Sequence, residues 1–243
     1  MKQWFKKNWI NILLILVLLL GIGLVAYPSV ADYWNSFHQS RAIAYYAEAV
    51  AEVDNETYRL MLEEASEYNE TLSENGSRWV PAAEDTNTYN KLLNINNTGI
   101  MGYIEIPKIK CSLPIYHGTD ASVLQIAIGH IEGSSLPVGG ESTHCVLSGH
   151  RGLPSARLFT DLDQMDTGDT FIIRVLDEIY TYEVDQVLIV EPNDLSQLEI
   201  VRGEDLCTLV TCTPYGINTH RLLVRGHRID TENTYEIRVT ADA

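Results

Sequence analysis

Three residues in the second half of the chain have types and positions that suit acyl transfer. Cys212 ends the apolar run TLVTC and precedes the turn sequence TPYG, which leaves its thiol at a strand end. His150 ends the run VLSGH, and Arg221 opens the run RLLVRG nine residues after Cys212. A thiolate is a nucleophile, a histidine can protonate a leaving amine, and a guanidinium stays cationic beside a developing oxyanion. Each residue type alone is more often structural, but together they predict cysteine-dependent acyl transfer.

Extended sequence blocks around these residues resemble those of a known family. The blocks are HIEGSSLPVGG (130–140), THCVLSGHRGLPSARLFTDLDQM (143–165) and TLVTCTPYGINTHRLLVRGHRI (208–229). They are similar to the signature blocks of sortases, and among these to the class C, pilus-polymerising group. The resemblance implies a closed β-barrel cysteine transpeptidase on the outer face of a Gram-positive membrane, acting without a metal or organic cofactor.

The resemblance also implies a role for each site residue. Cys212 would attack the Thr–Gly bond of an LPXTG-like sorting signal on a pilin or surface protein and form a thioacyl-enzyme. His150 would protonate the departing amine and deprotonate the incoming one, while Arg221 would hold the signal backbone and stabilise the oxyanion. A pilin lysine would then accept the acyl group in an isopeptide bond. We expect Thr211 and His220, next to Cys212 and Arg221 in the chain, to line the site.

The segment before the barrel departs from the family pattern. Class C sortases usually carry a lid in which an Asp-Pro-aromatic motif plugs the active site, and this sequence contains no Asp-Pro dipeptide. The sequence SRWVP (77–81) occupies the corresponding loop. We therefore expect Trp79, with Arg78 beside it, to cover Cys212. An open site beside a mobile loop is the alternative.

Two further cysteines precede the proposed catalytic residues at equal distances. Cys145 lies five residues before His150, and Cys207 lies five residues before Cys212. In regular strands an odd spacing turns each cysteine away from its catalytic neighbour. The two strands are parallel neighbours in the family barrel, so the resemblance implies that Cys145 and Cys207 lie close together. A disulfide bond and a pair of buried free thiols are both compatible with this position.

Short β-rich runs from residue 101 onward predict the strands that must position these residues. The runs alternate with period two between turn residues. They cover 101–106, 124–130, 144–150, 170–175, 179–190, 206–212, 221–227 and 235–240, and 154–165 has room for one short helix. This pattern predicts a mainly β fold, a closed eight-stranded barrel over residues 99–230 with a C-terminal strand or tail at 231–243.

The first 28 residues predict a membrane anchor. Residues 10–27 form an uncharged apolar run, about enough helix for the ~30 Å hydrocarbon layer. Because Lys2, Lys6 and Lys7 all precede this run, we expect a single pass with a cytoplasmic N-terminus and an extracellular catalytic domain. A signal peptide cleaved near Ala31 is the alternative. Residues 229–243 contain no second apolar span, so we expect this helix to be the sole tether.

Residues 29–98 connect the anchor to the barrel. Residues 29–75 contain no glycine and have apolar positions at helical spacing, which predicts two helices broken near Asp54 and Asn55, with Asp54 as the N-cap of the second. A solvated spacer is one interpretation of this acidic stretch. Residues 75–99 have the composition of a loop. We therefore expect a helical stalk followed by a lid loop.

The charge balance narrows the possible functions. The chain has 17 Lys+Arg against 33 Asp+Glu, a net charge of −16. This argues against nucleic acid as a partner, because such proteins need a basic face. The leading interpretation is a sortase that polymerises pilins. The alternatives are a sortase that attaches proteins to peptidoglycan and a catalytically silent, membrane-anchored module on the same barrel.

Overall fold

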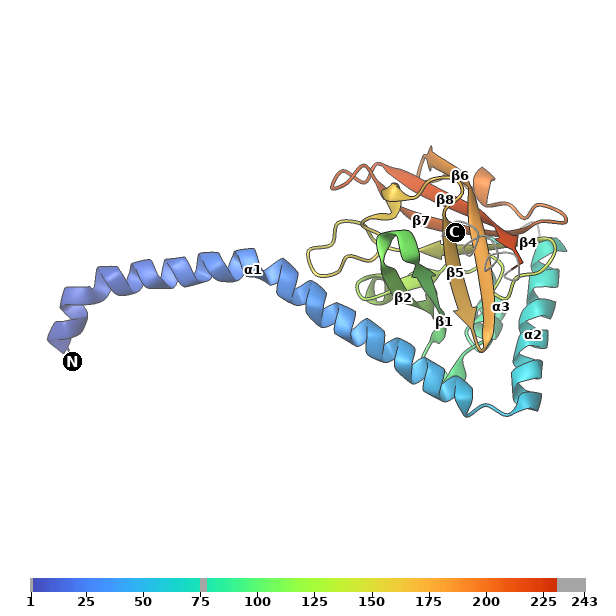
Figure 1. The fold of residues 1–243 in the computed structure, drawn as a ribbon, viewed down its shortest axis with the longest axis horizontal. Helices are drawn as coiled ribbons and strands as arrows, with labels where there is room; N and C mark the ends of the chain where they lie inside the picture. Colours follow the sequence, from blue (N-terminus) through green and yellow to red (C-terminus); the bar gives the residue numbers. More distant parts are fainter. Residues whose placement is uncertain (1, 75–77, 231–243) are drawn as a thin grey trace, which may run out of the picture.

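The body of the protein is a closed β-barrel with helices on one side (Figure 1). The computed structural model describes residues 2–74 and 78–230. The strands are β1 (Ile100–Ile106), β2 (Cys111–His117), β3 (Ile128–His130), β4 (Thr143–Ser148), β5 (Thr170–Val175), β6 (Glu178–Val190), β7 (Asp205–Thr213) and β8 (His220–Ile229). Their order around the barrel is β1-β2-β3-β4-β7-β8-β6-β5. The predicted eight-stranded barrel is confirmed.

Strand pairing brings distant parts of the chain together. The pairs β2–β3 and β4–β7 are parallel, and the other pairs are antiparallel. In the parallel pair Cys145 lies opposite Cys207 and Ser148 lies opposite Val210. Parallel neighbours end at the same edge of a sheet, so the residues that follow β4 meet those at the end of β7.

Alternation along the strands separates an inner from an outer apolar cluster. The barrel interior is filled by fully buried side chains such as Ile104, Leu147 and Leu209. The outer cluster lies on the opposite face of the same strands, because side chains alternate along a strand. It consists of the buried residues Val146, Leu198, Val210 and Leu223, against which Trp79, Ile131, Leu188 and Val190 pack.

Two long helices precede the barrel. α1 (Lys2–Ala51) continues through Pro28, and its N-terminal half extends away from the barrel (Figure 1). From Asn8 onward α1 is long and apolar enough to cross a membrane, by length and composition. α2 (Asn55–Glu74) begins after a break at the predicted position. Asp54 caps it, since Asp54 Oδ1 accepts hydrogen bonds from the backbone N–H groups of residues 56 and 57 at 3.1 and 3.0 Å.

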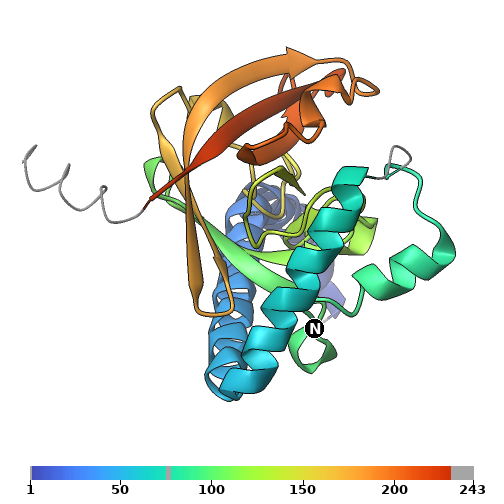
Figure 2. The same cartoon turned by 90° about the vertical axis from the view of Figure 1, so that its right-hand side faces the viewer.

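The inner faces of both helices pack on the barrel. Figure 2 shows α2, in cyan, inclined in front of the barrel. Tyr46 of α1 is buried, and its hydroxyl donates to the Met101 carbonyl at 3.0 Å and accepts from the Leu176 N–H at 2.8 Å. Asn69 of α2 is also buried and exchanges two hydrogen bonds with the backbone of Leu136. The solvated-spacer interpretation is therefore wrong, because these faces are part of the folded domain.

Several sequence-based boundaries differ from the structure. β2 was not predicted because Pro114 interrupts its pattern, yet the strand forms since its pairing with β3 begins only at Ile115. The run 124–130 is strand only in β3, after a short helix α4 (Ala121–Leu124), and 154–165 contains only the 3-10 turn η3 (Leu162–Gln164). The loop after α2 contains the short helix α3 (Ala83–Tyr89). The strand predicted at 235–240 lies outside the described residues.

Candidate active site

The ends of three neighbouring strands bring His150, Cys212 and Arg221 to one edge of the barrel. Cys212 of β7 and Arg221 of β8 are register partners. The β4–β7 register places Ser148 opposite Val210, and His150 and Cys212 each follow two residues later, His150 just after the end of β4. The backbone supports this continuation, because the Gly149 N–H donates to the Val210 carbonyl at 3.0 Å. The three residues predicted to act together are therefore neighbours in the fold.

The proposed nucleophile lies on the outer face of the barrel. Alternation along β7 gives Cys212 the same face as Val210, whereas Cys207 and Leu209 belong to the interior. His150 and Cys212 are both half-buried, so solvent reaches the site. By contrast, burial raises the pKa of Cys111 to about 12 and that of Cys207 well above its usual value. Those thiols stay protonated at neutral pH, and a protonated thiol is a poor nucleophile.

Arg221 presents a guanidinium whose donors are only partly used. Its Nη1 donates to the backbone carbonyls of Asn218 and His220 at 3.3 and 3.1 Å. Within the described residues no carboxylate forms an ion pair with Arg221. A guanidinium has five N–H donors, so Nη2 and Nε keep donors for an acceptor that binds beside Cys212.

The two residues expected to line the site have different surroundings. Thr211 is buried, and its hydroxyl donates to the Gly149 carbonyl at 2.7 Å. It thereby ties the segment that leads to His150 onto β7. His220 is more exposed, and its Nε2 lies 3.3 Å from Glu191 Oε1 while Nδ1 lies 2.9 Å from the Thr219 hydroxyl. Both residues adjoin the site. Thr211 lies within the barrel wall, and His220 lies at its rim.

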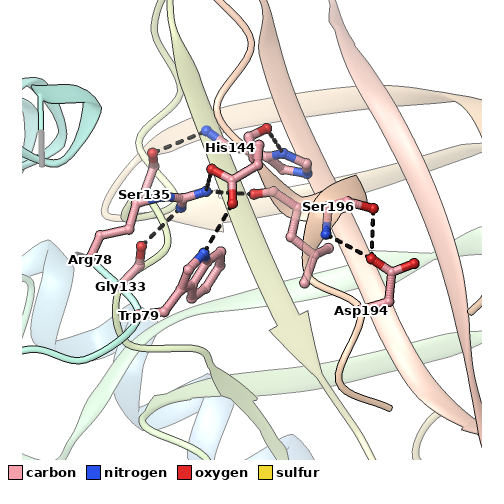
Figure 3. A network of polar contacts seen from close by, with 9 residues as sticks. Arg78, Trp79, Gly133, Ser135, His144, Asp194 and Ser196 are labelled. Carbon is pink, nitrogen blue, oxygen red and sulfur yellow. Dashed lines mark hydrogen bonds and ion pairs between the residues drawn. The ribbon is translucent and has the colours of Figure 1, made fainter. Parts of the chain in front are cut away.

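Trp79 packs against the outer cluster, and Arg78 lies beside it in a network of polar contacts (Figure 3). The Arg78 side chain is 5% exposed and donates to the carbonyls of Gly133 and Leu198 at 3.0 and 2.9 Å. Its Nη2 also pairs with Glu199 Oε2 at 3.0 Å, and Trp79 Nε1 donates to Glu199 Oε1 at 3.3 Å. The guanidinium carbon lies 4.1 Å from the centre of the indole ring. Both side chains are thus held at Leu198 and Glu199, and Trp79 packs against the outer cluster to which Val210 belongs.

Backbone packing supports this arrangement. Gly133 has a φ of +88°, and a Cβ there would lie 2.2 Å from the Arg78 carbonyl oxygen. Glycine tolerates a positive φ and has no Cβ to clash with the Arg78 carbonyl, so Gly133 lets the segment 78–79 approach the barrel. His144 holds the backbone of Glu199 in place, because its ring nitrogens lie 2.8 Å from the Glu199 carbonyl oxygen and 2.7 Å from the Thr208 hydroxyl.

The pKa values of Glu199 and His144 are consistent with these contacts. The hydrogen bond from Arg78 lowers the pKa of Glu199, so this carboxylate is ionised at neutral pH. Burial lowers the pKa of His144 to about 4, so its imidazole is neutral there. Sequence reasoning missed Glu199, Gly133 and the supporting role of His144. No local pattern points to Glu199, because it lies more than a hundred residues from its partners.

The remaining cysteine prediction is resolved by the strand register. Cys145 and Cys207 are directly opposite each other, and both are buried in the inner cluster. Their predicted proximity is confirmed. Both are free thiols in the structure, so no disulfide joins them. Within the described residues no group of three or more His, Cys, Asp or Glu side chains is arranged to hold a metal ion.

The sequence and the fold are both similar to those of known proteins. A family model described as "Sortase domain" matches residues 104–229. The chain is 54% identical to sortase C1 from Streptococcus agalactiae, with a TM-score of 0.77 over 79% of this chain and 99% of that one. It is 45% identical to sortase C from Streptococcus pneumoniae, with a TM-score of 0.72 over 78% of this chain and 97% of that one.

A curated relative extends the comparison. Sortase D from Bacillus subtilis is 33% identical over 131 residues, which cover 53% of this chain and 63% of that protein. The matched region thus spans less than two thirds of that relative. These two structural neighbours are class C sortases, as the sequence blocks predicted. The chain therefore belongs to the sortase family of cysteine transpeptidases.

Proposed function

We propose that this sortase cleaves an LPXTG-like sorting signal with Cys212 and transfers the acyl group to a lysine of a pilin, which polymerises pili. The observation that carries the proposal is the meeting of Cys212, Arg221 and the His150 segment at one edge of the barrel. Class C neighbours with 45–54% identity support the pilin assignment. The structure from Streptococcus pneumoniae is described in terms of pilin substrate specificity, and we extend that substrate class to this chain.

The first half-reaction forms a thioester. The Cys212 thiolate attacks the threonine carbonyl carbon of the signal, and the developing oxyanion accepts hydrogen bonds from the free donors of Arg221. The C–N bond to glycine then breaks, and the leaving amine takes a proton from the His150 imidazolium. The products are a thioacyl-enzyme on Cys212, a free glycine amine and a neutral imidazole.

The second half-reaction restores the enzyme. His150 accepts a proton from the incoming lysine ammonium, and the resulting amine attacks the thioester carbonyl. The C–S bond breaks, the attacking nitrogen loses its second proton to solvent as the isopeptide bond forms, and the thiolate of Cys212 is regenerated. The released glycine amine takes up one proton from solvent, so atoms and charges balance over the two steps.

The outer cluster supplies a surface for the signal. It runs along β4, β7 and β8 to Val210, which shares the face of Cys212. Apolar side chains of a bound peptide would be desolvated there, which favours binding. We propose that Trp79 occupies this surface and covers the approach to Cys212 until the segment 78–79 is displaced. The three hydrogen bonds of buried Arg78 favour this covered site over an open one.

We further propose that α1 anchors the enzyme with its N-terminus in the cytoplasm and the barrel outside. The basic residues of the sequence's first turns precede the apolar stretch of α1. The barrel contacts α1 soon after that stretch, because Asp32 Oδ1 accepts from the Arg157 N–H at 2.9 Å and Asn35 Nδ2 donates to the Ser155 carbonyl at 2.7 Å. On this arrangement residues 1–28 form the anchor, 29–98 the stalk and lid, and 99–230 the catalytic domain.

Reconstitution with a pilin tests the proposed function. The full chain in detergent micelles is mixed with a pilin that carries an LPXTG-type signal, and products are separated under denaturing conditions. We expect covalent pilin ladders that disappear with Cys212→Ala. A chain that consumes the signal but joins it only to peptidoglycan amines would contradict the pilin assignment. A chain that neither cleaves nor binds it covalently would contradict the enzymatic one.

A further inference from the structure

Arg151 directly follows His150, and its guanidinium is buried between the segments that hold the proposed catalytic residues. Its side chain is 8% exposed. Nη1 donates to the hydroxyl of Thr213, the residue after Cys212, at 3.3 Å. Nη2 forms an ion pair with Asp163 in the turn η3. One side chain thus connects the segment after β4, the end of β7 and the loop before β5.

The same two segments are also in contact through Tyr215. The guanidinium carbon of Arg151 lies 5.8 Å from the centre of the Tyr215 ring. At Gly152, where φ is +75°, an added Cβ would lie 3.0 Å from this ring. The segments carrying His150 and Cys212 therefore pack directly on each other beside Arg151.

The environment of Arg151 is costly for a residue with only a structural role. Burying a guanidinium carries a desolvation penalty, and well-packed apolar residues often give equal or greater stability. Asp163 compensates the charge, but Nε of Arg151 is buried without a hydrogen-bond partner among the described residues. Of the two bonds that Arg151 makes, one leads to Thr213 at the end of β7, next to Cys212, and the other to Asp163 in η3.

We infer that Arg151 is a positioning residue that fixes the separation of His150 and Cys212 by tying the segment after β4 to the end of β7. This inference rests on the proposed function. Proton transfer and nucleophilic attack depend steeply on geometry, and a displacement of about 1 Å costs about a hundredfold in rate. Arg221, whose donors are partly free, contacts the substrate, whereas Arg151 acts through its two catalytic neighbours.

The test compares two conservative arginine variants in the full chain. Arg151→Lys keeps the charge but loses the geometry that reaches Thr213 and Asp163 together. Arg157→Lys is the matched control, since Arg157 lies in the same loop with a side chain that is 70% exposed. We measure kcat and KM with an LPXTG-type peptide over a range of pH, and melting temperatures.

We expect Arg151→Lys to lower kcat about tenfold to a hundredfold while KM stays within about twofold. The pH profile of kcat should change shape, because proton transfer from a displaced His150 becomes limiting. A role confined to stability would lower the melting temperature and leave the pH profile of the folded enzyme unchanged. Arg157→Lys should leave all of these unchanged.

A second variant keeps the inference testable if Arg151→Lys does not fold. Thr213→Val removes the hydroxyl that accepts from Arg151 and preserves the shape of the side chain. We expect it to lower kcat in the same direction, and the double variant to be no slower than Arg151→Lys, because both remove one link. Wild-type kcat in both variants, or strictly additive effects, would overturn the inference. An inactive wild-type chain would instead contradict the proposed function.

Discussion

The Arg78 guanidinium and the Glu199 carboxylate form an ion pair, with Nη2 and Oε2 3.0 Å apart, between the segment before the barrel and the loop before β7. The pair is asymmetric, because Arg78 is 5% and Glu199 59% exposed. An exposed carboxylate contributes little as a charge partner alone. Its importance lies in holding Trp79 as well, through the hydrogen bond from Nε1 to Oε1 at 3.3 Å. This pair is the attachment point of the proposed cover.

Trp79→Ala tests whether the indole limits access to Cys212. Removing the ring uncovers the outer cluster, which includes Val210, so the rate of Cys212 alkylation by iodoacetamide should rise about tenfold or more. Trp34→Ala is the control, because Trp34 lies on α1 and is 64% exposed. An unchanged alkylation rate in Trp79→Ala would remove the proposal that this residue covers the site.

Glu199→Gln tests the attachment point itself. The amide keeps the size of the side chain but loses the charge that pairs with Arg78, and it leaves a buried guanidinium without its counter-ion. We expect faster Cys212 alkylation and a lower KM for the peptide, with kcat unchanged. Glu204→Gln, which changes an exposed acid in the same loop, should behave as wild type. Equal KM values for the two variants would contradict the role of Glu199.

His144 should make stability depend on pH. Burial lowers its pKa from 6.5 to about 4, so the unfolded chain binds a proton in this range while the folded chain does not. The free energy of unfolding should therefore fall as pH decreases from 6.5 towards 4, by about 3 kcal/mol in total from this group. Urea unfolding at several pH values measures the slope.

His144→Gln should flatten this slope, whereas His220→Gln, whose ring is 41% exposed, should not. Burial also lowers the pKa of His117, which adds a decline of the same sign that both variants retain. A wild-type slope in His144→Gln would show that His144 is protonated to the same extent in the folded and unfolded chain.

The contact between α1 and the loop after His150 should depend on two polar side chains. The double variant Asp32→Ala and Asn35→Ala removes the hydrogen bonds to Arg157 and Ser155. We expect faster amide exchange in residues 153–158 and an unchanged melting temperature, because the barrel core is untouched. Ser40→Ala, whose hydroxyl bonds only within α1, is the control. Unchanged exchange in the double variant would show that packing alone holds this loop.

Alternation and turn residues predicted the barrel, since seven of its strands follow runs that alternate apolar and polar residues. β2 was missed because Pro114 is unfavourable in a strand with two hydrogen-bonded neighbours. The acidic stalk was misread for another reason. Its apolar positions at helical spacing predicted helices, but a single sequence does not show which surface covers them. Tyr46 and Asn69 reveal that surface only through their bonds to the barrel.

The site was predictable to the extent that its residues lie at strand ends. Cys212, His150 and Arg221 were recognised from such positions and from extended sequence blocks. Glu199 and the role of Arg151 were not recognised, because their partners are far away in the sequence and because the burial of Arg151 is visible only in the structure. Arg151 stands beside His150 in the chain, yet only the structure shows that its guanidinium reaches Thr213.

Intact-mass measurement of the thioacyl intermediate tests the central claim most directly. The full chain in detergent micelles is mixed with an LPXTG-type peptide without an acceptor amine, quenched in acid and compared with Cys212→Ala. The proposed mechanism predicts a mass increase equal to the peptide fragment that ends at threonine less one water, located on Cys212, removed by hydroxylamine and absent from Cys212→Ala. An unmodified Cys212, even in Trp79→Ala where the cover is removed, would contradict it.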